Sequence, residues 1–209
     1  MNLDQIRAEY GKRSLTEDAA GDEPFALLNT WLEDAVRAEV LEPNAMVLST
    51  ADAAGAPSSR VVLLRGVHDR ALRFFSNYHS RKGRELAGRA QAAALFFWPA
   101  LERQVRVQGT VTRIAPAESD AYFASRPRES RIGALVSPQS AEITRAELDA
   151  RYAELSAQFS DDVPRPEHWG GYHLNAEYIE FWQGGAHRLH DRIAFRKHPQ
   201  GWQRSRLAP

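Results

Sequence analysis

Three cationic or protonatable side chains alternate near the end of the chain, at Arg188, His190 and Arg192. Alternate residues of a β-strand share one face, so a strand here would align the three groups over about 13 Å, at roughly 3.3 Å per residue. Arginines bind phosphates and carboxylates, and a histidine can exchange a proton near neutral pH. The row therefore predicts a site for an anionic ligand, although a solvated edge strand has the same pattern.

A second cationic group is the run Ser80-Arg81-Lys82, where Ser80 can cap a short helix that stops at Gly88. Backbone N–H groups at a helix start, together with two cations, form a phosphate site. The alternative is an ordinary capped helix on the surface.

Arg60 and Arg65 flank the apolar run Val61-Val62-Leu63-Leu64. Five residues apart, they lie on opposite faces of a regular strand, so both reach one site only if the strand ends or bulges between them. Otherwise the two charges only mark the ends of a buried strand.

Tyr122 and Arg126 are four residues apart and share one face of a predicted helix, with Ser130 in the next segment. A phenol, a guanidinium and a hydroxyl can together donate to one phosphate. A surface pair is the alternative. A further polar and aromatic set offers what an isoalloxazine ring needs, namely amide partners for its polar edge and an aromatic wall: Gln104, Gln139, Ser140 and Trp182.

Composition excludes several other kinds of site. Acidic and basic residues balance at 27 each, so no basic field for nucleic acid covers the whole surface. Without cysteine there is no thiolate nucleophile, no disulfide and no cysteine metal site. No Gly-rich nucleotide motif and no G-x-S-x-G elbow occurs. No H-E-x-x-H pair occurs either, so no metal site is expected. With no secretory signal and no apolar run of membrane length, a cytoplasmic protein is expected.

The elements that must position these residues are mostly short strands joined by hairpin-length turns. Alternating or apolar runs predict strands at Ala45–Thr50, Ser58–Arg65, Ala71–Ser76, Ala92–Trp98, Arg103–Ile114, Gly171–Trp182, His187–Lys197 and from Trp202. Helices are expected from Pro24, from Ser80 to Gly88, between Pro116 and Pro127, and from a capping box at Thr144 to about Phe159. This order favours a mainly β antiparallel barrel with flanking helices. One domain is expected over residues 24–209, after a flexible arm of residues 1–23.

Eight blocks, in this order, resemble the pyridoxamine 5′-phosphate oxidase family. They are Arg60-Val61-Val62-Leu63-Leu64-Arg65, Phe74-Phe75-Ser76-Asn77-Tyr78 with Ser80-Arg81-Lys82, Leu101-Glu102-Arg103-Gln104-Val105-Arg106-Val107, Tyr122-Phe123-Ala124-Ser125-Arg126-Pro127, Ser137-Pro138-Gln139-Ser140, Trp169-Gly170-Gly171-Tyr172, Glu180-Phe181-Trp182-Gln183-Gly184 and Arg188-Leu189-His190-Asp191-Arg192, with Arg206-Leu207-Ala208-Pro209 at the end. The resemblance covers nearly everything after Pro24.

The resemblance implies an FMN-binding split β-barrel that works as a homodimer with flavin at the subunit interface. It implies FMN contacts from Arg60, Val61, Val62, Leu63, Leu64, Arg65, Phe75, Ser76, Arg81, Lys82, Gln104, Gln139, Ser140, Trp182 and Arg192. Substrate would be bound by Arg65, Tyr122, Arg126, Ser130, Arg188, Leu189 and His190, with Arg188 and His190 as the catalytic pair over the substrate ring.

The reaction implied is oxidation of pyridoxamine or pyridoxine 5′-phosphate to pyridoxal 5′-phosphate. Hydride leaves C4′ for flavin N5, and O₂ reoxidises the flavin to give H₂O₂. The sequence departs from the family at position 65, where Arg65 replaces the usual lysine with a wider, forked cation. Leu135 and Ala186 stand where a tryptophan and an acid are common. Two other functions fit the same blocks: a related flavin oxidase with another substrate, such as those of phenazine synthesis, and a non-catalytic carrier of flavin or B6 phosphate.

Overall fold

The computed structural model describes residues 9–209, which fall into two compact units. The first unit holds the residues up to Leu48 together with Ala93–Gly109 and Ala176–Pro209. The second unit holds Ser49–Ala92 and Thr110–Asn175. The chain passes between the units several times, so each is built from distant stretches of sequence. One domain over residues 24–209 stays a prediction.

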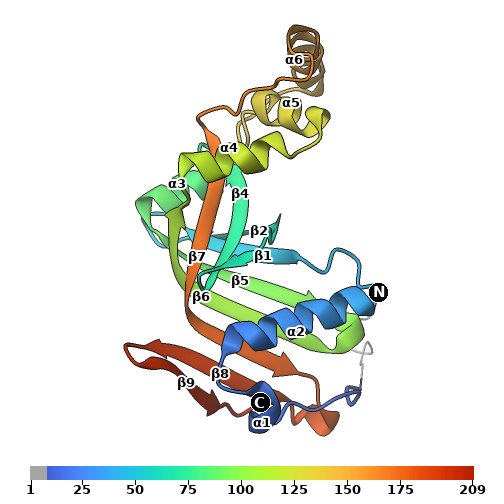
Figure 1. The fold of residues 1–209 in the computed structure, drawn as a ribbon, viewed down its shortest axis with the longest axis vertical. Helices are drawn as coiled ribbons and strands as arrows, with labels where there is room; N and C mark the ends of the chain where they lie inside the picture. The colour runs from blue at the N-terminus through green and yellow to red at the C-terminus, as the bar shows by residue number, and fades with distance from the viewer. Residues whose placement is uncertain (1–8) are drawn as a thin grey trace. The chain divides into compact units, whose positions relative to one another are not determined.

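The strands form an antiparallel sheet of nine in the described part of the chain, in the order β2-β1-β5-β6-β7-β4-β3, with β8 pairing β7 and β9 (Figure 1). They are β1 Ala45–Ala51, β2 Pro57–Leu63, β3 Val67–His68, β4 Ala71–Asn77, β5 Gln91–Trp98, β6 Arg103–Arg113, β7 Trp169–Gln183, β8 Asp191–His198 and β9 Gly201–Arg206. The predicted strands are confirmed except at the end of β2, which stops at Leu63 rather than Arg65, and at the start of β8, and β3 was not expected. The antiparallel order is the one that hairpin-length turns favour.

The helices are α1 Glu17–Ala20, α2 Pro24–Arg37, α3 Arg81–Gly88, α4 Pro116–Ala124, α5 Arg128–Val136 and α6 Arg145–Gln158, with 3₁₀ turns η2 Pro99–Leu101 and η3 Ala186–Arg188. The predicted caps are confirmed: Ser80 accepts the N–H of Gly83, and Thr144 forms a capping box with Glu147. Helices α1 and α5 were not expected. None of the helices in residues 9–209 is both long and apolar enough to cross a membrane.

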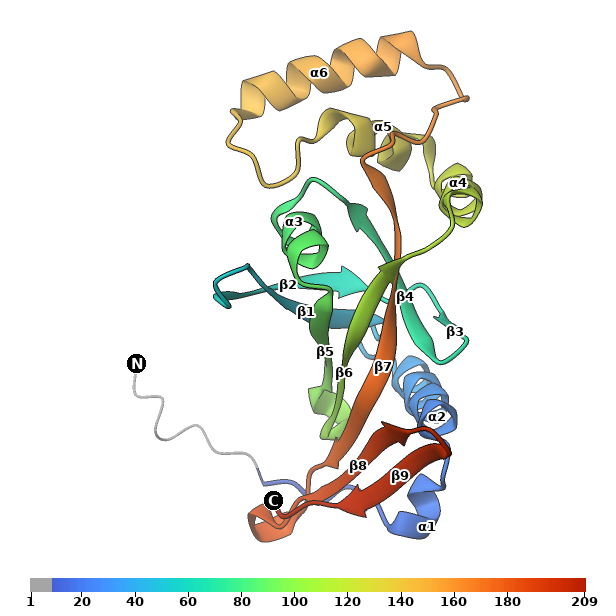
Figure 2. The same cartoon turned by 90° about the vertical axis from the view of Figure 1, so that its left-hand side faces the viewer.

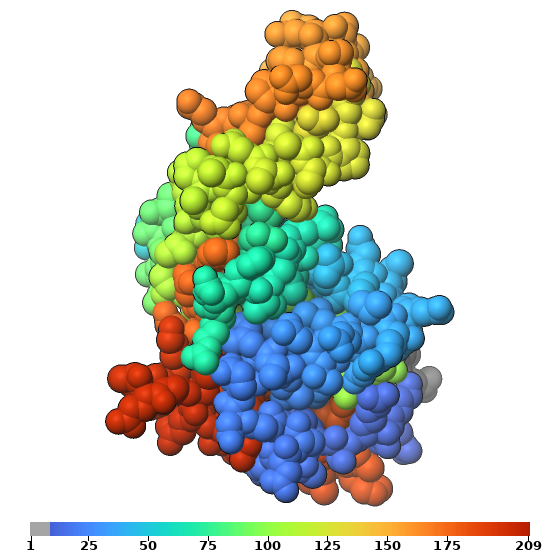
Figure 3. Space-filling view, viewed as in Figure 1, coloured from blue at the N-terminus to red at the C-terminus, as the bar shows by residue number. Residues whose placement is uncertain are grey.

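The second unit joins a sheet to a helical layer. Strands β4 and β7 run side by side (Figure 2), with Phe75 opposite Gly171 and Asn77 opposite Trp169. Trp169 belongs to an apolar cluster with Phe123 of α4 and Ile132 of α5. Helix α6 contributes no buried residue and lies on the outer side of α5, as the space-filling view also shows (Figure 3). The cluster therefore fixes α4 and α5 against the end of β7.

The first unit buries one face of α2, whose apolar residues recur at helical spacing. Leu28 and Ala35 are fully buried, and Trp31 meets Phe181 of β7 edge to face with centroids 5.2 Å apart. Val36, near the end of the same helix, is by contrast exposed. Strand β8 pairs with β7 and β9, with Trp182 opposite Arg192.

The segment before α2 contacts the first unit through polar groups. The N–H groups of Gly11 and Lys12 donate to the Glu102 carboxylate at 2.9 and 3.0 Å. Leu15 N–H donates to Asp191 at 2.9 Å, and Glu17 pairs with Arg206 at 2.6 Å. The first eight residues of the arm lie outside the described residues, and a flexible arm over residues 1–23 stays a prediction.

Candidate functional site

A pocket of about 870 Å³ lies in the second unit. Its walls come from β2, β4, α3 and α4, from α5 and from the segment that follows α5. The lining residues are Ser58, Ser59, Arg60, Val61, Val62, Leu63, Arg65, Phe75, Ser76, Asn77, Arg81, Lys82, Tyr122, Arg126, Ser130, Gly133, Ala134, Ser137, Gln139, Ser140 and Trp169. Two of the residue groups predicted to bind phosphate are far apart in sequence, yet they share this one cavity. Its size is typical of cavities that bind cofactors and substrates.

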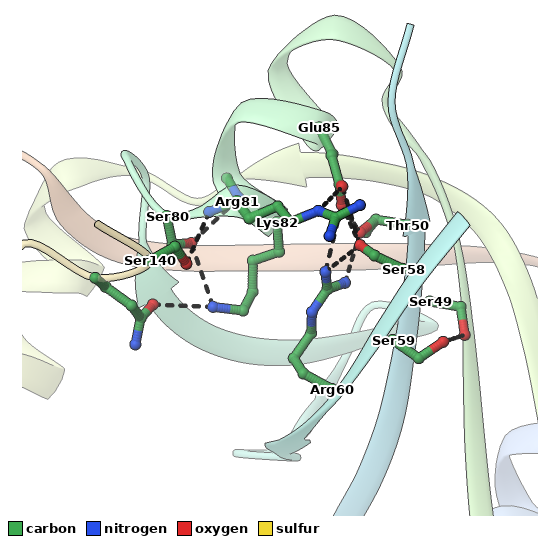
Figure 4. Close-up of polar contacts among 12 residues, drawn as sticks. Ser49, Thr50, Ser58, Ser59, Arg60, Ser80, Arg81, Lys82, Glu85 and Ser140 are labelled. Carbon is green, nitrogen blue, oxygen red and sulfur yellow. Dashed lines mark hydrogen bonds and ion pairs between the residues drawn. The ribbon is translucent and has the colours of Figure 1, made fainter. Parts of the chain in front are cut away.

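The first cationic group contains Arg60, Arg81 and Lys82 (Figure 4). Ser80 caps α3, and this places Arg81 and Lys82 in the first turn of that helix. The backbone N–H of Arg81 donates to Ser140 Oγ at 3.1 Å. We call Arg60, Arg81 and Lys82 the α3 cradle.

Glu85, one turn further along α3, is a buried carboxylate behind these cations. It accepts from Arg81 Nε at 2.8 Å and from Arg60 Nη2 at 3.3 Å. The hydroxyls of Thr50 and Ser58 also donate to it. Burial by itself raises the pKa of Glu85, but these four donors outweigh burial and lower the pKa to about 2. The carboxylate is therefore ionised at any physiological pH.

Lys82 is the cation of the cradle most removed from solvent. Its Nζ donates to Gln139 Oε1 at 2.9 Å and to Ser80 Oγ at 3.2 Å. Burial and then repulsion from Arg60 lower the pKa of Lys82 to about 8, against a smaller opposing effect of Glu85. An ammonium with a depressed pKa gains most from an anionic ligand, because the ligand restores its charged form.

The second cationic group consists of Arg126 with Tyr122, Arg65 and Ser130, all in the same pocket wall. Burial, and then repulsion from Arg65, lowers the pKa of Arg126, although Tyr122 opposes this. Arg126 Nη1 is buried and has no hydrogen-bond partner in the described structure. A buried donor without a partner is costly, and an anion bound at this wall would remove that cost. We call these four residues the α4 cradle.

Aromatic rings stack beneath the α4 cradle. Phe75 and Tyr122 lie 3.8 Å apart between centroids at 15°, and Phe75 and Trp169 lie 5.4 Å apart at 12°. The guanidinium of Arg126 lies 4.8 Å from the Trp169 ring centroid, a cation–π contact. The stack holds the ring of Tyr122 and the face of the Arg126 guanidinium in place without using their hydrogen-bond donors.

The end of β2 explains how Arg60 and Arg65 reach one cavity. The strand stops at Leu63, and Leu64 is buried in the core rather than in the pocket wall. Arg65 then pairs with β4 through its backbone N–H, which donates to the Arg73 carbonyl at 2.8 Å. The expected condition, a strand that ends between the two arginines, is met. Leu64 alone of the expected run Arg60–Arg65 does not line the pocket.

The prediction that Arg188, His190 and Arg192 lie in a row on one strand was wrong. Strand β8 begins only at Asp191, and Ala186–Arg188 is a 3₁₀ turn. His187 and Arg188 have φ of 55° and 63°, so the left-handed backbone breaks the alternation that the strand required. Gly184-Gly185 before the turn was the available sign, since glycine pairs interrupt strands.

The structure still packs His190 against Trp182, which was expected to contact the flavin, and both residues belong to the first unit. The ring centroid of His190 lies 4.6 Å from Trp182 and 5.7 Å from Tyr10. His190 Nδ1 accepts the N–H of Gly185 at 3.1 Å, so in the neutral ring Nε2 carries the proton. Arg188 and Leu189 are exposed beside it.

Arg192 and Gln104 complete the predicted set in this unit. Arg192 Nε donates to the buried Glu180 carboxylate at 2.9 Å, and Arg106 reaches the same carboxylate at 3.2 Å. Gln104 is half-buried on β6. The set Gln104, Trp182, Arg188, Leu189, His190 and Arg192 therefore belongs to the first unit, and the pocket to the second.

Several pocket residues escaped the sequence reasoning, among them Ser58, Asn77, Ser137 and the buried Glu85 behind them. Small polar residues and a glutamate in a helix are ordinary surface types, so only three-dimensional contact distinguishes them. The alternation of Ser58 with Arg60 was the one available signal, because alternate strand residues share a face. In residues 9–209 no group of three metal-ligating side chains converges.

Comparison with known proteins identifies the family. The model of the pyridoxamine 5′-phosphate oxidase family matches residues 32–202. The chain belongs to this family. A pyridoxine/pyridoxamine 5′-phosphate oxidase of Thermosynechococcus vestitus is 52% identical over 98% of this chain and 97% of its own length. One of Ectopseudomonas mendocina is 53% identical over 99% of this chain and 98% of its own length.

Solved structures confirm the predicted split-barrel fold of this oxidase family member. The crystal structure of PhzG from Burkholderia lata, in complex with tetrahydrophenazine-1-carboxylic acid, matches with a TM-score of 0.90 and 33% identity, covering 96% of this chain and 100% of its own. An FMN binding protein from Nostoc punctiforme, related to pyridoxamine 5′-phosphate oxidase, matches with a TM-score of 0.73 at 16% identity over 89% of this chain and 97% of its own. The second likeness concerns the fold alone.

Proposed function

We propose that this protein is an FMN-dependent oxidase that converts pyridoxamine 5′-phosphate and pyridoxine 5′-phosphate to pyridoxal 5′-phosphate. The observation that carries the proposal is one pocket with two separate cationic cradles, the α3 cradle and the α4 cradle. A reaction between a phosphorylated cofactor and a phosphorylated substrate needs two such cradles. Relatives about 50% identical over their full length carry the name of this activity.

The α3 cradle fits the phosphate of FMN. Arg60, Arg81 and Lys82 supply the charge, and Ser140 sits where it already accepts the Arg81 N–H. The ring would lie along the β2 and β4 walls, and the residues proposed to contact it are Val61, Val62, Leu63, Phe75, Ser76 and Gln139. Leu64 would support this wall from the core.

The α4 cradle fits the substrate phosphate. Arg126, with its buried unpartnered Nη1, would donate to it together with Tyr122 and Ser130. Arg65 would add a forked cation where the family resemblance implies a lysine, and this keeps the charge while changing the donor geometry.

We propose that the protein acts as a homodimer with FMN at the interface, where Gln104, Trp182 and Arg192 join the ligand set. Bound there, FMN would supply the two-electron chemistry: it would take the hydride from substrate C4′, and O₂ would then take up the electrons as H₂O₂. Arg188 would orient the substrate and stabilise charge near C4′. His190 would hold a proton at Nε2 beside the substrate ring, because Gly185 occupies Nδ1. Leu189 would line the same place.

A related flavin oxidase with an unphosphorylated substrate is the second candidate, since PhzG is 33% identical. Arg126 alone could also bind a carboxylate. Arg126, Tyr122 and Ser130 together supply donors for the three oxygens of a phosphate, and the α4 cradle therefore favours the phosphorylated substrates. A carrier has no need of Arg188 and His190 over a substrate.

The test is to purify the protein, record its flavin spectrum, and add pyridoxine 5′-phosphate in air. We expect a yellow protein that forms pyridoxal 5′-phosphate and H₂O₂ in equal amounts. A protein that neither carries nor binds FMN overturns the proposal, and a yellow protein without turnover points to the carrier.

A further inference from the structure

Glu85 is a buried acidic residue beside Arg60 and Arg81 of the α3 cradle (Figure 4). Taking a carboxylate out of water costs several kcal/mol, and a well-packed apolar residue is often as stable in such a place. The fold alone therefore gives little reason for a glutamate at this position of α3. The reason is to be sought in the groups that the carboxylate holds.

Both arginines of the α3 cradle are tied to this one carboxylate. Arg81 reaches it through Nε, four residues earlier on the same helix, with N···O 2.8 Å. Arg60 reaches it from β2 through Nη2 at 3.3 Å. Because Arg81 uses only Nε, its two terminal nitrogens make no hydrogen bond in the described structure. They stay available for a phosphate, and their direction is set by the bond to Glu85.

Two hydroxyls fix the carboxylate itself. Ser58 Oγ lies 2.9 and 2.7 Å from its two oxygens, and Thr50 Oγ1 donates to Oε2 from β1. Arg60 donates to both hydroxyls in turn. The network thus joins two strands and a helix, and no buried side-chain atom of Thr50, Ser58, Arg60 or Glu85 lacks a partner in the described structure. This is the condition under which a buried polar network rigidifies its site.

The carboxylate also sets the charge of the cradle. Three cations, Arg60, Arg81 and Lys82, stand against one Glu85, which leaves two net positive charges. A phosphate monoester carries about −1.5 to −2 charges at pH 7. With Glu85 ionised, the cradle matches one dianionic phosphate.

We infer that Glu85 is a positioning residue that orients Arg60 and Arg81 toward the phosphate of the flavin. The inference rests on the proposed FMN binding. Glu85 would then help to bind the phosphate, whereas electrostatic repulsion alone would make a nearby carboxylate weaken phosphate binding.

The test compares FMN with riboflavin, which lacks the phosphate, on the apoprotein and on Glu85→Gln. We expect the substitution to raise the Kd for FMN by about tenfold or more, since charge-assisted bonds to the two arginines are lost. The Kd for riboflavin should stay within about twofold, because Glu85 acts only through phosphate ligands. Glu102→Gln is the matched control, because Glu102 is a buried glutamate of the first unit whose carboxylate accepts, among the described residues, only the N–H groups of Gly11 and Lys12.

Each outcome decides something. Wild-type protein that does not bind FMN overturns the proposed function itself. Wild-type protein that binds FMN, with Glu85→Gln binding it equally or more tightly, overturns the positioning role alone. An equal loss of FMN and riboflavin makes Glu85 merely structural and also overturns it. If Glu85→Gln does not fold, Glu85→Asp keeps the charge but shortens the reach, and the same selective loss of FMN is expected; unchanged FMN affinity contradicts the inference.

Discussion

The pH dependence of FMN binding follows from Lys82. In the free protein its pKa is about 8, lowered first by burial and then by Arg60. A bound phosphate favours the ammonium form and returns the pKa toward its ordinary value of 10.5. Binding therefore takes up a proton above pH 8, and the affinity falls as the pH rises. From these two values, we expect the Kd to rise about tenfold between pH 7 and pH 9.

Fluorescence titration of the apoprotein with FMN over pH 6.5–9 measures this slope, since free flavin fluoresces and binding quenches it. Lys82→Arg supplies the matched control, because guanidinium keeps its charge over this range and the Kd should become nearly independent of pH. Lys82→Met should also flatten the profile while weakening binding at pH 7. A wild-type Kd that stays constant to pH 9, or a slope that survives in Lys82→Arg, would refute the reasoning.

Four further predictions concern other residues. Arg126→Leu should raise KM for pyridoxine 5′-phosphate by about a hundredfold, from the loss of a charged bond to phosphate, with FMN affinity unchanged; steady-state kinetics and FMN titration check this. Arg188→Leu should cut turnover far more than FMN binding, and an equal loss of both contradicts its role. The pKa of the Glu85 carboxyl is lowered from 4.5 to about 2, so its ionised form contributes stability that is present above pH 4.5 and lost as the pH falls toward 2. Glu85→Gln should therefore flatten the acid side of a plot of unfolding free energy against pH, and an unchanged plot speaks against this contribution. Gly83→Ala should destabilise the protein by about 2 kcal/mol in urea unfolding, because an added Cβ would stand 2.2 Å from the Tyr78 carbonyl oxygen; an unfolding curve like that of wild type counts against this geometry.

The sequence predicted the position of a site residue best where the residue type and the local strand or helix pattern indicated the same structure. Strand alternation and the Ser80 cap placed Arg60 and Lys82 correctly, since both depend on neighbours in sequence. The cavity that joins them to Arg126 depends on the pairing of β4 with β7 and on the cluster around Trp169. No local pattern encodes those long-range contacts.

Three features were missed, each for its own physical reason. The turn at Ala186–Arg188 has left-handed residues that no propensity favours. Contacts of this segment with the rest of its unit hold it, such as the packing of His190 against Trp182 and Tyr10. Helix α5 follows Pro127 directly and was missed because a proline was taken as an end, although it also begins helices. Glu85 looked like a surface residue because its partners come from two distant strands.

The measurement that tests the central claim most directly is the oxidation of pyridoxine 5′-phosphate against unphosphorylated pyridoxine by the FMN-loaded protein. Two cradles in one pocket predict that the phosphorylated substrate yields its aldehyde and H₂O₂ with kcat/KM higher by about a hundredfold or more, as for a buried charged contact. Equal rates for the two substrates, or no aldehyde from either, would contradict the account.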